Sequence, residues 1–215
     1  MFSGVFVPDL DLTEALHTVA VTGAAFVPEA LAEAFREGLQ REIEGGPLEP
    51  APYQIGQVRQ ETEVLTISAP MDGYPTVAAL CRALTDLVRR QGRGIAGLDR
   101  YAPNVCHVQR YRPGALGITP HLDGKRFALL VAVFTTKGSA RFTIHAERFG
   151  PPIEAWEVTP GSLVLLRGPG LAGIPDGRPF HAVGGPVAEP RYSVSFRMDT
   201  RAQPAPLNAP GTDLR

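Results

Sequence analysis

The second half of the chain contains a series of short strand-like segments, and this series restricts the fold more than any other feature of the sequence. The segments are apolar or alternate between polar and apolar residues, and turns such as Lys137-Gly138 and Pro160-Gly161 separate them. Short strands bounded by Gly and Pro favour an antiparallel sandwich or barrel. The predicted strands cover residues 104–111, 127–134, 140–146, 153–158, 162–167, 179–183 and 191–197.

The first 100 residues predict a different organisation. Residues 1–27 are typical of short extended pieces, and Pro28 is a favourable first-turn residue for a helix that ends at Gly45-Gly46-Pro47. A second helix is predicted over residues 76–91, and residues 53–68 suggest a hairpin-like pair of strands. Apolar residues recur every four positions in the first helix, at Leu31, Phe35, Leu39 and Ile43.

Composition limits the remaining choices. The 215 residues include 23 Gly and 21 Pro, and the formal net charge is −1, which gives no overall basic field for nucleic acid. Cys81 and Cys106 are too few for a disulfide scaffold or a zinc site, as expected in a reducing cytoplasm. We predict no signal peptide and no membrane span, because no apolar run approaches about 18 residues.

The last predicted strand, residues 191–197, has one polar and one apolar face. Its sequence is Arg-Tyr-Ser-Val-Ser-Phe-Arg, so Arg191 and Arg197 project to the same side as the two serines. At roughly 3.3 Å per residue the two arginines lie about 20 Å apart along the strand. Guanidinium groups bind carboxylates bidentately and stay charged, so this face is expected to line a cavity that holds a small dicarboxylate.

Three other side chains form a candidate metal site. His121 and Asp123 alternate within an extended segment and project to one side, and His181 follows far along the chain. Two imidazoles and one carboxylate form the facial triad of non-haem Fe(II) oxygenases. An antiparallel double-sheet barrel brings such distant strands together.

These motifs together resemble those of the AlkB-type 2-oxoglutarate/Fe(II) dioxygenases. The resemblance covers roughly residues 100–200 and implies an α+β protein with a double-stranded β-helix (jelly roll, cupin-like) core. It also implies N-terminal helices packed on one sheet and an N-terminal substrate lid. The motifs are Tyr111-Arg-Pro-Gly114, His121-x-Asp123, His181 and Arg191-x-Ser-x-Ser-Phe-Arg197.

The resemblance assigns a role to each motif. Arg191 would bind the distal carboxylate of the cosubstrate 2-oxoglutarate, and Tyr111 would bond the same molecule. Arg197 would lie beside the Asp123 ligand and the proximal carboxylate. Gln109 and Ser193 stand where the family has asparagines and keep the capacity to hydrogen bond. The iron ligands would be His121, Asp123 and His181.

The expected activity is hydroxylation or oxidative demethylation of a substrate C–H bond. We expect a small-molecule substrate, because Lys125 stands where base-repair members often carry an acidic residue and the net charge is −1. The alternatives are a repair demethylase acting on alkylated nucleobases and a catalytically silent jelly-roll binding module. The oligomeric state is not predicted.

The domain prediction is a single unit over residues 1–215. Helices and lid occupy 1–100, the catalytic core 101–200 and a tail 201–215. His145-Ala-Glu147 has the same spacing as the proposed ligands, but we expect a structural pair there because no arginine strand follows it at the right distance. The lid candidates are Tyr53, Gln57, Arg59 and Glu61. A basic cluster that is a candidate for phosphate contact consists of Arg82, Arg89, Arg90, Arg93 and Arg100.

Overall fold

The structure is a computed structural model and describes residues 4–201; all but the first residue of the predicted 201–215 tail lies outside this range. The α-helices are α1 (Thr13–Thr22), α2 (Glu33–Glu44) and α3 (Pro75–Gln91), and the short 3-10 helices are η1 (Leu98–Arg100) and η2 (Leu171–Gly173). The strands of the N-terminal half are β1 (Ala24–Val27), β2 (Glu49–Pro50), β3 (Gln54–Ile55), β4 (Val58–Arg59) and β5 (Glu63–Ser68). Those of the C-terminal half are β6 (Val105–Tyr111), β7 (Gly117–His121), β8 (Phe127–Lys137), β9 (Ala140–His145), β10 (Pro152–Val158), β11 (Leu163–Arg167), β12 (Phe180–Gly184) and β13 (Arg191–Asp199).

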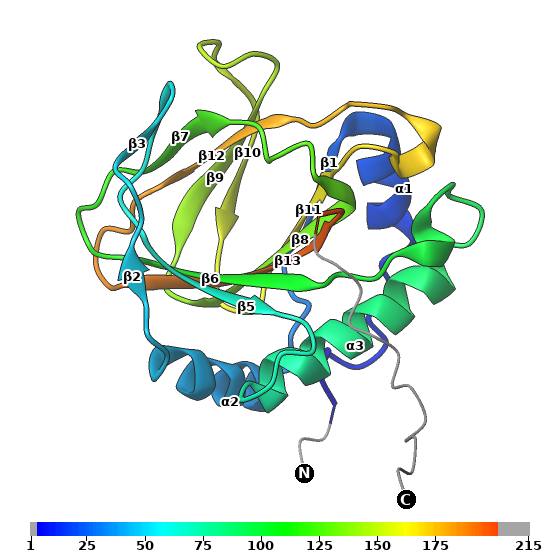
Figure 1. The fold of residues 1–215 in the computed structure, drawn as a ribbon, viewed down its shortest axis with the longest axis horizontal. Coiled ribbons are helices and arrows are strands. Elements are labelled where there is room, and N and C mark those ends of the chain that lie inside the picture. The colour runs from blue at the N-terminus through cyan, green and yellow to red at the C-terminus, as the bar shows by residue number, and fades with distance from the viewer. Residues whose placement is uncertain (1–3, 202–215) are drawn as a thin grey trace, which may run out of the picture.

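Two antiparallel sheets form the core of the fold. The large sheet has the order β1-β11-β8-β13-β6-β5-β2, and the small sheet has the order β10-β9-β12-β7. Neighbours in these sheets are far apart in the chain, which is typical of a double-stranded β-helix. The predicted jelly-roll architecture is therefore confirmed, and Figure 1 shows the two sheets enclosing the barrel interior.

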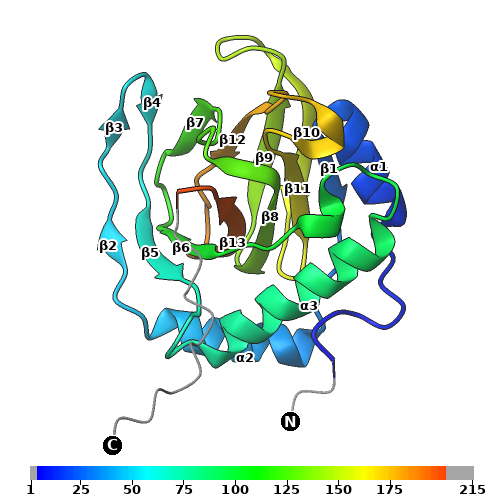
Figure 2. The same ribbon diagram turned by 45° about the vertical axis from the view of Figure 1, so that its right-hand side comes forward.

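The helices cover the outer face of the large sheet, as predicted. In both views α2 and α3 run beneath β5, β6, β13 and β8 (Figures 1 and 2). Their apolar stripes lie at helical spacing, with Phe35, Leu39 and Ile43 on α2 completely or almost completely buried. On the sheet side, Val194 and Phe196 of β13 belong to the same core cluster.

A second core lies inside the barrel between the two sheets. Strand β8 contributes to both cores, because Leu130 and Phe134 face the helices whereas Val131 and Val133 face the small sheet. This confirms the prediction that the apolar run from residue 127 forms a strand buried on both faces. Phe142 and Val183 of the small sheet complete the inner core.

The N-terminal region differs from the prediction in two places. Residues 13–22 form a helix, not an extended piece: Leu16, Val19 and Ala20 are buried at helical spacing. The helix expected to begin at Pro28 begins at Glu33, because residues before it remain extended and Leu31 forms a bridge with Phe6.

Residues 49–68 wrap around one side of the barrel instead of forming one simple hairpin. Strand β5 joins β6 in the large sheet, whereas β3 and β4 form a separate two-stranded hairpin that stands beside β7 (Figure 2). The edge strand β2 carries Pro50, and Pro52 follows, which removes backbone donors from this edge. None of the helices within residues 4–201 is long and apolar enough to span a membrane.

Candidate metal centre

The pairing of β7 with β12 brings the two predicted histidine ligands together. His121 and His181 are direct Cα partners in this register, although 60 positions separate them in the chain. Their ring centroids lie 4.3 Å apart and the rings are tilted by 52°. Strand β7 was not among the predicted strands, so the structure supplies the element that positions His121.

Asp123 completes the cluster from the segment just beyond β7. Its Oδ2 atom lies 4.0 Å from Nε2 of His181, and one ligand atom from each of the three residues falls within 4.8 Å of the others. Within residues 4–201 this is the one group of His, Cys, Asp or Glu side chains with such geometry. The Oδ2 atom is buried and has no hydrogen-bond partner there.

The backbone fixes which nitrogen of each ring is free. Nδ1 of His121 lies 3.0 Å from the carbonyl oxygen of Thr119, and Nδ1 of His181 lies 3.1 Å from that of Pro179. A carbonyl oxygen only accepts hydrogen bonds, so each Nδ1 carries the proton and each Nε2 keeps its lone pair. This is the arrangement in which protein histidines bind metals.

The surroundings of His121, His181 and Asp123 favour the protonation states in which these side chains bind a metal. Burial lowers the pKa of His121, and it lowers the pKa of His181 to about 3, so both rings are neutral at pH 7. Burial is the largest single effect on the pKa of Asp123 and would raise it, but Arg197, His181 and His121 together outweigh burial and hold this pKa at about 2. The site thus offers two neutral imidazoles and one carboxylate, a donor set that fits Fe(II).

Arg197 connects the carboxylate ligand to the large sheet. Its Nη2 atom lies 3.4 Å from Oδ1 of Asp123, while Nη1 donates to Oγ of Ser195 and lies 3.1 Å from Nδ1 of His107. Burial, followed by the nearby Arg197 charge, lowers the pKa of His107 to about 3. The sequence offers no partner pattern for His107, yet the structure shows that it contacts Arg197 and so supports the site. Its position two residues before Gln109 on the same strand face was the signal for this role.

A cavity between the sheets extends from the histidines to Arg191. The proposed cosubstrate residues Gln109, Tyr111, Arg191, Ser193 and Arg197 all line it, together with His121 and His181. The polar face of β13 therefore points into a cavity, as expected from its alternation.

Arg191 is the most unusual residue of this cavity. Only 1% of its surface is exposed, and within residues 4–201 no carboxylate lies within ion-pair distance of it. Nη2 donates to Oγ1 of Thr135 at 3.0 Å, and the guanidinium lies over the Tyr111 ring at 5.4 Å. Its Nε atom and Oγ of Ser193 have no partners. Buried charges are normally paired, so these groups fit a carboxylate-bearing ligand.

His145 and Glu147 do not belong to the metal cluster. The ring nitrogens of His145 lie 2.9 Å from Oγ1 of Thr143 and 3.0 Å from the carbonyl oxygen of Gly150, which leaves no free nitrogen. Glu147 is exposed in the loop that follows. The expected structural role of His145 is consistent with these bonds, which brace the β9–β10 loop.

The β3–β4 hairpin lies next to the strand that carries His121. The backbone N–H of Arg59 donates to Oγ1 of Thr119 at 3.0 Å, and this hydroxyl is 3.2 Å from the carbonyl of Arg59. The side chain of Val58 packs against the inner core. The hairpin and the β9–β10 loop project from the same end of the barrel in both views (Figures 1 and 2).

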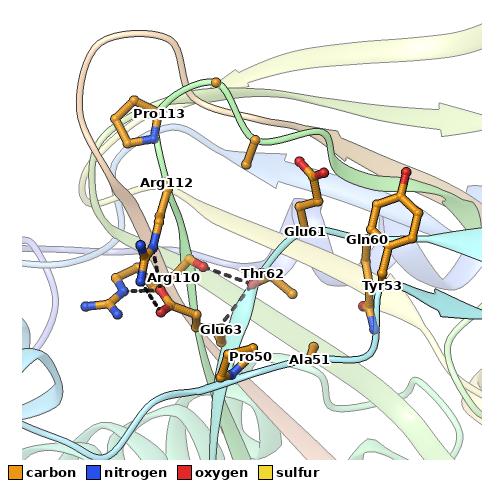
Figure 3. Close-up of a pocket in the computed structure, with 12 residues that line it drawn as sticks. Pro50, Ala51, Tyr53, Gln60, Glu61, Thr62, Glu63, Arg110, Arg112 and Pro113 are labelled. Carbon is orange, nitrogen blue, oxygen red and sulfur yellow. Dashed lines mark hydrogen bonds and ion pairs between the residues drawn. The ribbon is translucent and has the colours of Figure 1, made fainter.

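A larger cavity, of about 570 Å³, lies outside the barrel and contains none of the predicted iron or cosubstrate residues. Figure 3 shows Glu63 at its wall between Arg110 and Arg112, with Tyr53 and Glu61 on the other side. Glu63 forms ion pairs with both arginines, and their hydrogen bonds lower its pKa to about 2. Glu61 accepts from the backbone N–H of Leu116, so each charged side chain of this cavity has a partner and the cavity shows no comparable demand for a ligand.

Comparisons with known proteins bear on the fold. Neither a family model nor a curated protein matches the sequence. Among solved structures, the chain is similar to a 2OG-Fe(II) oxygenase family oxidoreductase from Burkholderia pseudomallei, with a TM-score of 0.64 and 13% identity over 90% of this chain and 96% of that one.

Two further solved structures are similar to the chain. A prolyl hydroxylase from Trichoplax adhaerens, solved with a peptide fragment of the hypoxia inducible factor oxygen degradation domain, gives a TM-score of 0.62 and 12% identity over 87% of this chain and 89% of that chain. The OsALKBH1 structure gives a TM-score of 0.53 and 15% identity over 81% of this chain and 97% of that chain. The fold is thus that of 2OG-Fe(II) oxygenases, and the AlkB-type subfamily stays a prediction.

Proposed function

We propose that the protein is a 2-oxoglutarate- and Fe(II)-dependent oxygenase that hydroxylates a substrate C–H bond. The observation that carries this proposal is that one cavity is lined both by the two histidines of a His-Asp-His donor cluster and by a buried Arg191 without a carboxylate partner. Either feature alone has ordinary explanations. Together they match one metal ion and one keto diacid bound side by side.

The proposed roles combine the family resemblance with the geometry of this chain. His121, Asp123 and His181 would hold the iron through two Nε2 atoms and a carboxylate. Arg191 would bind the distal carboxylate of 2-oxoglutarate, and its neighbours Tyr111, Gln109 and Ser193 would add polar contacts. Bound iron and cosubstrate supply the oxygen activation, which yields succinate, CO₂ and a hydroxylated product.

The protein's own contribution is orientation and exclusion of water. Thr119 and Pro179 hold the imidazoles through their carbonyl groups, and Arg197 holds the Asp123 carboxylate ionised. Ile118, Val133 and Phe142 form an apolar part of the cavity wall. These side chains would shield a reactive metal site from bulk water.

The substrate is proposed to be a small molecule that approaches beside the β3–β4 hairpin, which we propose as the lid. One similar structure contains a bound peptide and another is that of OsALKBH1, so nucleobase demethylation is the alternative to be tested. Titration with methylated oligonucleotides at a stated salt concentration separates the two, since nanomolar affinity would favour the nucleic acid. We also propose one domain over residues 1–215 and a cytoplasmic location.

Iron-dependent release of succinate from 2-oxoglutarate tests the activity without a known substrate. The protein is loaded with Fe(II) without oxygen, mixed with 2-oxoglutarate, and exposed to air. We expect slow uncoupled turnover, which the His181→Ala substitution should abolish. His17 is an exposed residue of α1, and the His17→Ala substitution should leave the turnover unchanged. Absence of turnover in the wild-type protein would instead support a silent binding module.

A further inference from the structure

The sheet does not fix the third ligand. His121 and His181 are held by the β7–β12 register, whereas β7 ends at His121 and Asp123 lies in an irregular segment beyond it. The position of Asp123 therefore depends on side-chain bonds. Arg197 reaches its carboxylate, but only at 3.4 Å. A second contact is needed to hold its backbone.

Arg178 supplies this second contact. Its Nη1 atom donates to the backbone carbonyl oxygen of Asp123. Its other donors form a bidentate pair with Asp176, from Nε to Oδ1 at 2.8 Å and from Nη2 to Oδ2 at 2.9 Å. The Arg178 side chain is only 8% exposed and its bond to Asp123 is partly buried, whereas the Asp176 carboxylate is 40% exposed to water.

The same side chain lies next to the second histidine ligand in sequence. Pro179, whose carbonyl orients His181, directly follows Arg178. Lys125, two residues after Asp123, lies 3.6 Å from Asp176 and adds a weaker, exposed link between the same two segments. One guanidinium thus joins the backbone of the carboxylate ligand to the segment that leads into the distal histidine.

We infer that Arg178 is a positioning residue for the metal site: it holds Asp123 against the His181 segment so that the three donors stay within one coordination sphere. This inference rests on the proposed metal site. The fork geometry matters because one planar group must reach a carbonyl and a carboxylate together, which a lysine ammonium cannot do in the same way. Loss of outer partners of metal ligands typically weakens metal binding about 10- to 100-fold.

The test measures metal affinity of the whole chain. Apoprotein is titrated with Co(II), and both the dissociation constant and the ligand-field absorption are recorded for wild type, Arg178→Met and Arg178→Lys. We expect both variants to bind Co(II) about 10- to 100-fold more weakly, with an altered absorption spectrum. The thermal midpoint of each apoprotein is recorded in parallel, because a purely structural role would change that midpoint and leave the spectrum unaltered.

Arg167→Met is the matched control. Arg167 anchors the same loop by donating to the carbonyl of Gly177 at 2.7 Å, one residue from Arg178, and it also reaches the carbonyl of Ala20 at 3.1 Å. It does not bond to a metal ligand. We expect Arg167→Met to lower the midpoint while keeping Co(II) affinity within about twofold.

Two results would overturn the inference: wild-type affinity and spectrum in both Arg178 variants, or an equal loss of affinity in Arg167→Met. If wild-type protein itself bound no Co(II), or if His181→Ala bound it unchanged, the proposed metal site would fail instead. The two failures are therefore distinguishable.

Discussion

Arg191 combines a cost to stability with a function in ligand binding. Burial lowers the pKa of this guanidinium, which shows that its environment disfavours the charge. An apolar side chain of similar length would remove that penalty, since replacing buried charges by hydrophobic residues is often neutral or stabilising. We expect the thermal midpoint of Arg191→Met apoprotein to equal or exceed that of wild type.

The same substitution should remove the anchor for 2-oxoglutarate. We expect its affinity, measured by calorimetry on the Co(II)-loaded protein, to fall about 100-fold, as for a buried charge pair losing one partner. Co(II) affinity should stay unchanged. Arg36→Met, which removes an arginine outside the barrel that donates to the carbonyl of Thr136, serves as control. Unchanged 2-oxoglutarate affinity in Arg191→Met would contradict the assigned role.

The predicted cosubstrate residues that line the cavity share one property: strand alternation sets their direction. Tyr111 and Gln109 on β6, and Arg191 and Ser193 on β13, face inward because each pair is separated by two positions. Arg178 had no such signal. Its role depends on two loops whose conformation follows from tertiary packing, and no local pattern encodes that.

The hydroxyl of Thr119 couples two elements, the β3–β4 hairpin and strand β7. It both accepts from and donates to the backbone of Arg59, whereas its carbonyl orients His121. Thr119→Val keeps the shape and the carbonyl but removes the hydroxyl. We expect amide exchange at residues 54–60 to accelerate about tenfold, the effect of roughly 1–2 kcal/mol of lost hydrogen bonding.

Metal binding should not depend on the Thr119 hydroxyl. Co(II) affinity of Thr119→Val should stay within about twofold of wild type, because the bond from His121 Nδ1 to the residue 119 carbonyl remains. Weaker metal binding with unchanged exchange would show that the hydroxyl supports His121 and not the hairpin.

At the level of elements, segments with a clear local pattern were predictable, and segments whose structure depends on tertiary packing were not. The strands β6 and β8–β13 and helix α3 lie close to their expected ranges. Helix α1 was missed because its Thr and Val residues favour strands locally. Its three buried residues at helical spacing stabilise the helix only when it packs on the sheet. Strand β7 contains Pro120 and one strongly apolar residue, Ile118, so alternation could not reveal it.

Glu63 joins β5 to β6 by an ion pair across a direct strand register with Arg110. Its pKa is about 2, against an ordinary value of 4.5. A lowered carboxyl pKa stabilises the folded state above the unfolded value, and this stabilisation is lost as pH falls from about 4.5 through about 2. We expect Glu63→Gln to lower the free energy of unfolding by roughly 1–2 kcal/mol at pH 7. The loss is no larger because solvent in the open pocket partly screens the ion pair.

Denaturant unfolding of wild type and Glu63→Gln between pH 7 and pH 2 measures this difference. The difference in the free energy of unfolding between the two proteins should shrink toward zero as the pH approaches 2. Glu33→Gln is the control, since Glu33 is 83% exposed and its partner Arg36 lies 3.9 Å away. A difference between wild type and Glu63→Gln that stayed constant with pH would show that packing and not charge is responsible.

Across the whole molecule, the candidate site is divided between the two sheets. Both histidines lie on strands of the small sheet, whereas Arg191 and Arg197 lie on β13 of the large sheet. Metal alone would therefore link β7, β12 and the Asp123 segment within one side of the barrel. Cosubstrate bound to metal and to Arg191 would connect that side to the other. Ligand binding should therefore stabilise the barrel in two separate steps.

Thermal unfolding checks this division. In wild-type protein freed of metal by a chelator, we expect 2-oxoglutarate alone to raise the midpoint little, Co(II) alone to raise it, and both together to raise it by more than the sum. A ligand at 100 times its dissociation constant adds about 2.7 kcal/mol to the free energy of unfolding. For a chain of this size, that raises the thermal midpoint by roughly 5–10 °C. His181→Ala should lose both increments, because without the metal the cosubstrate has only its arginine. If 2-oxoglutarate raised the midpoint equally with and without metal, the two sheets would not share one site.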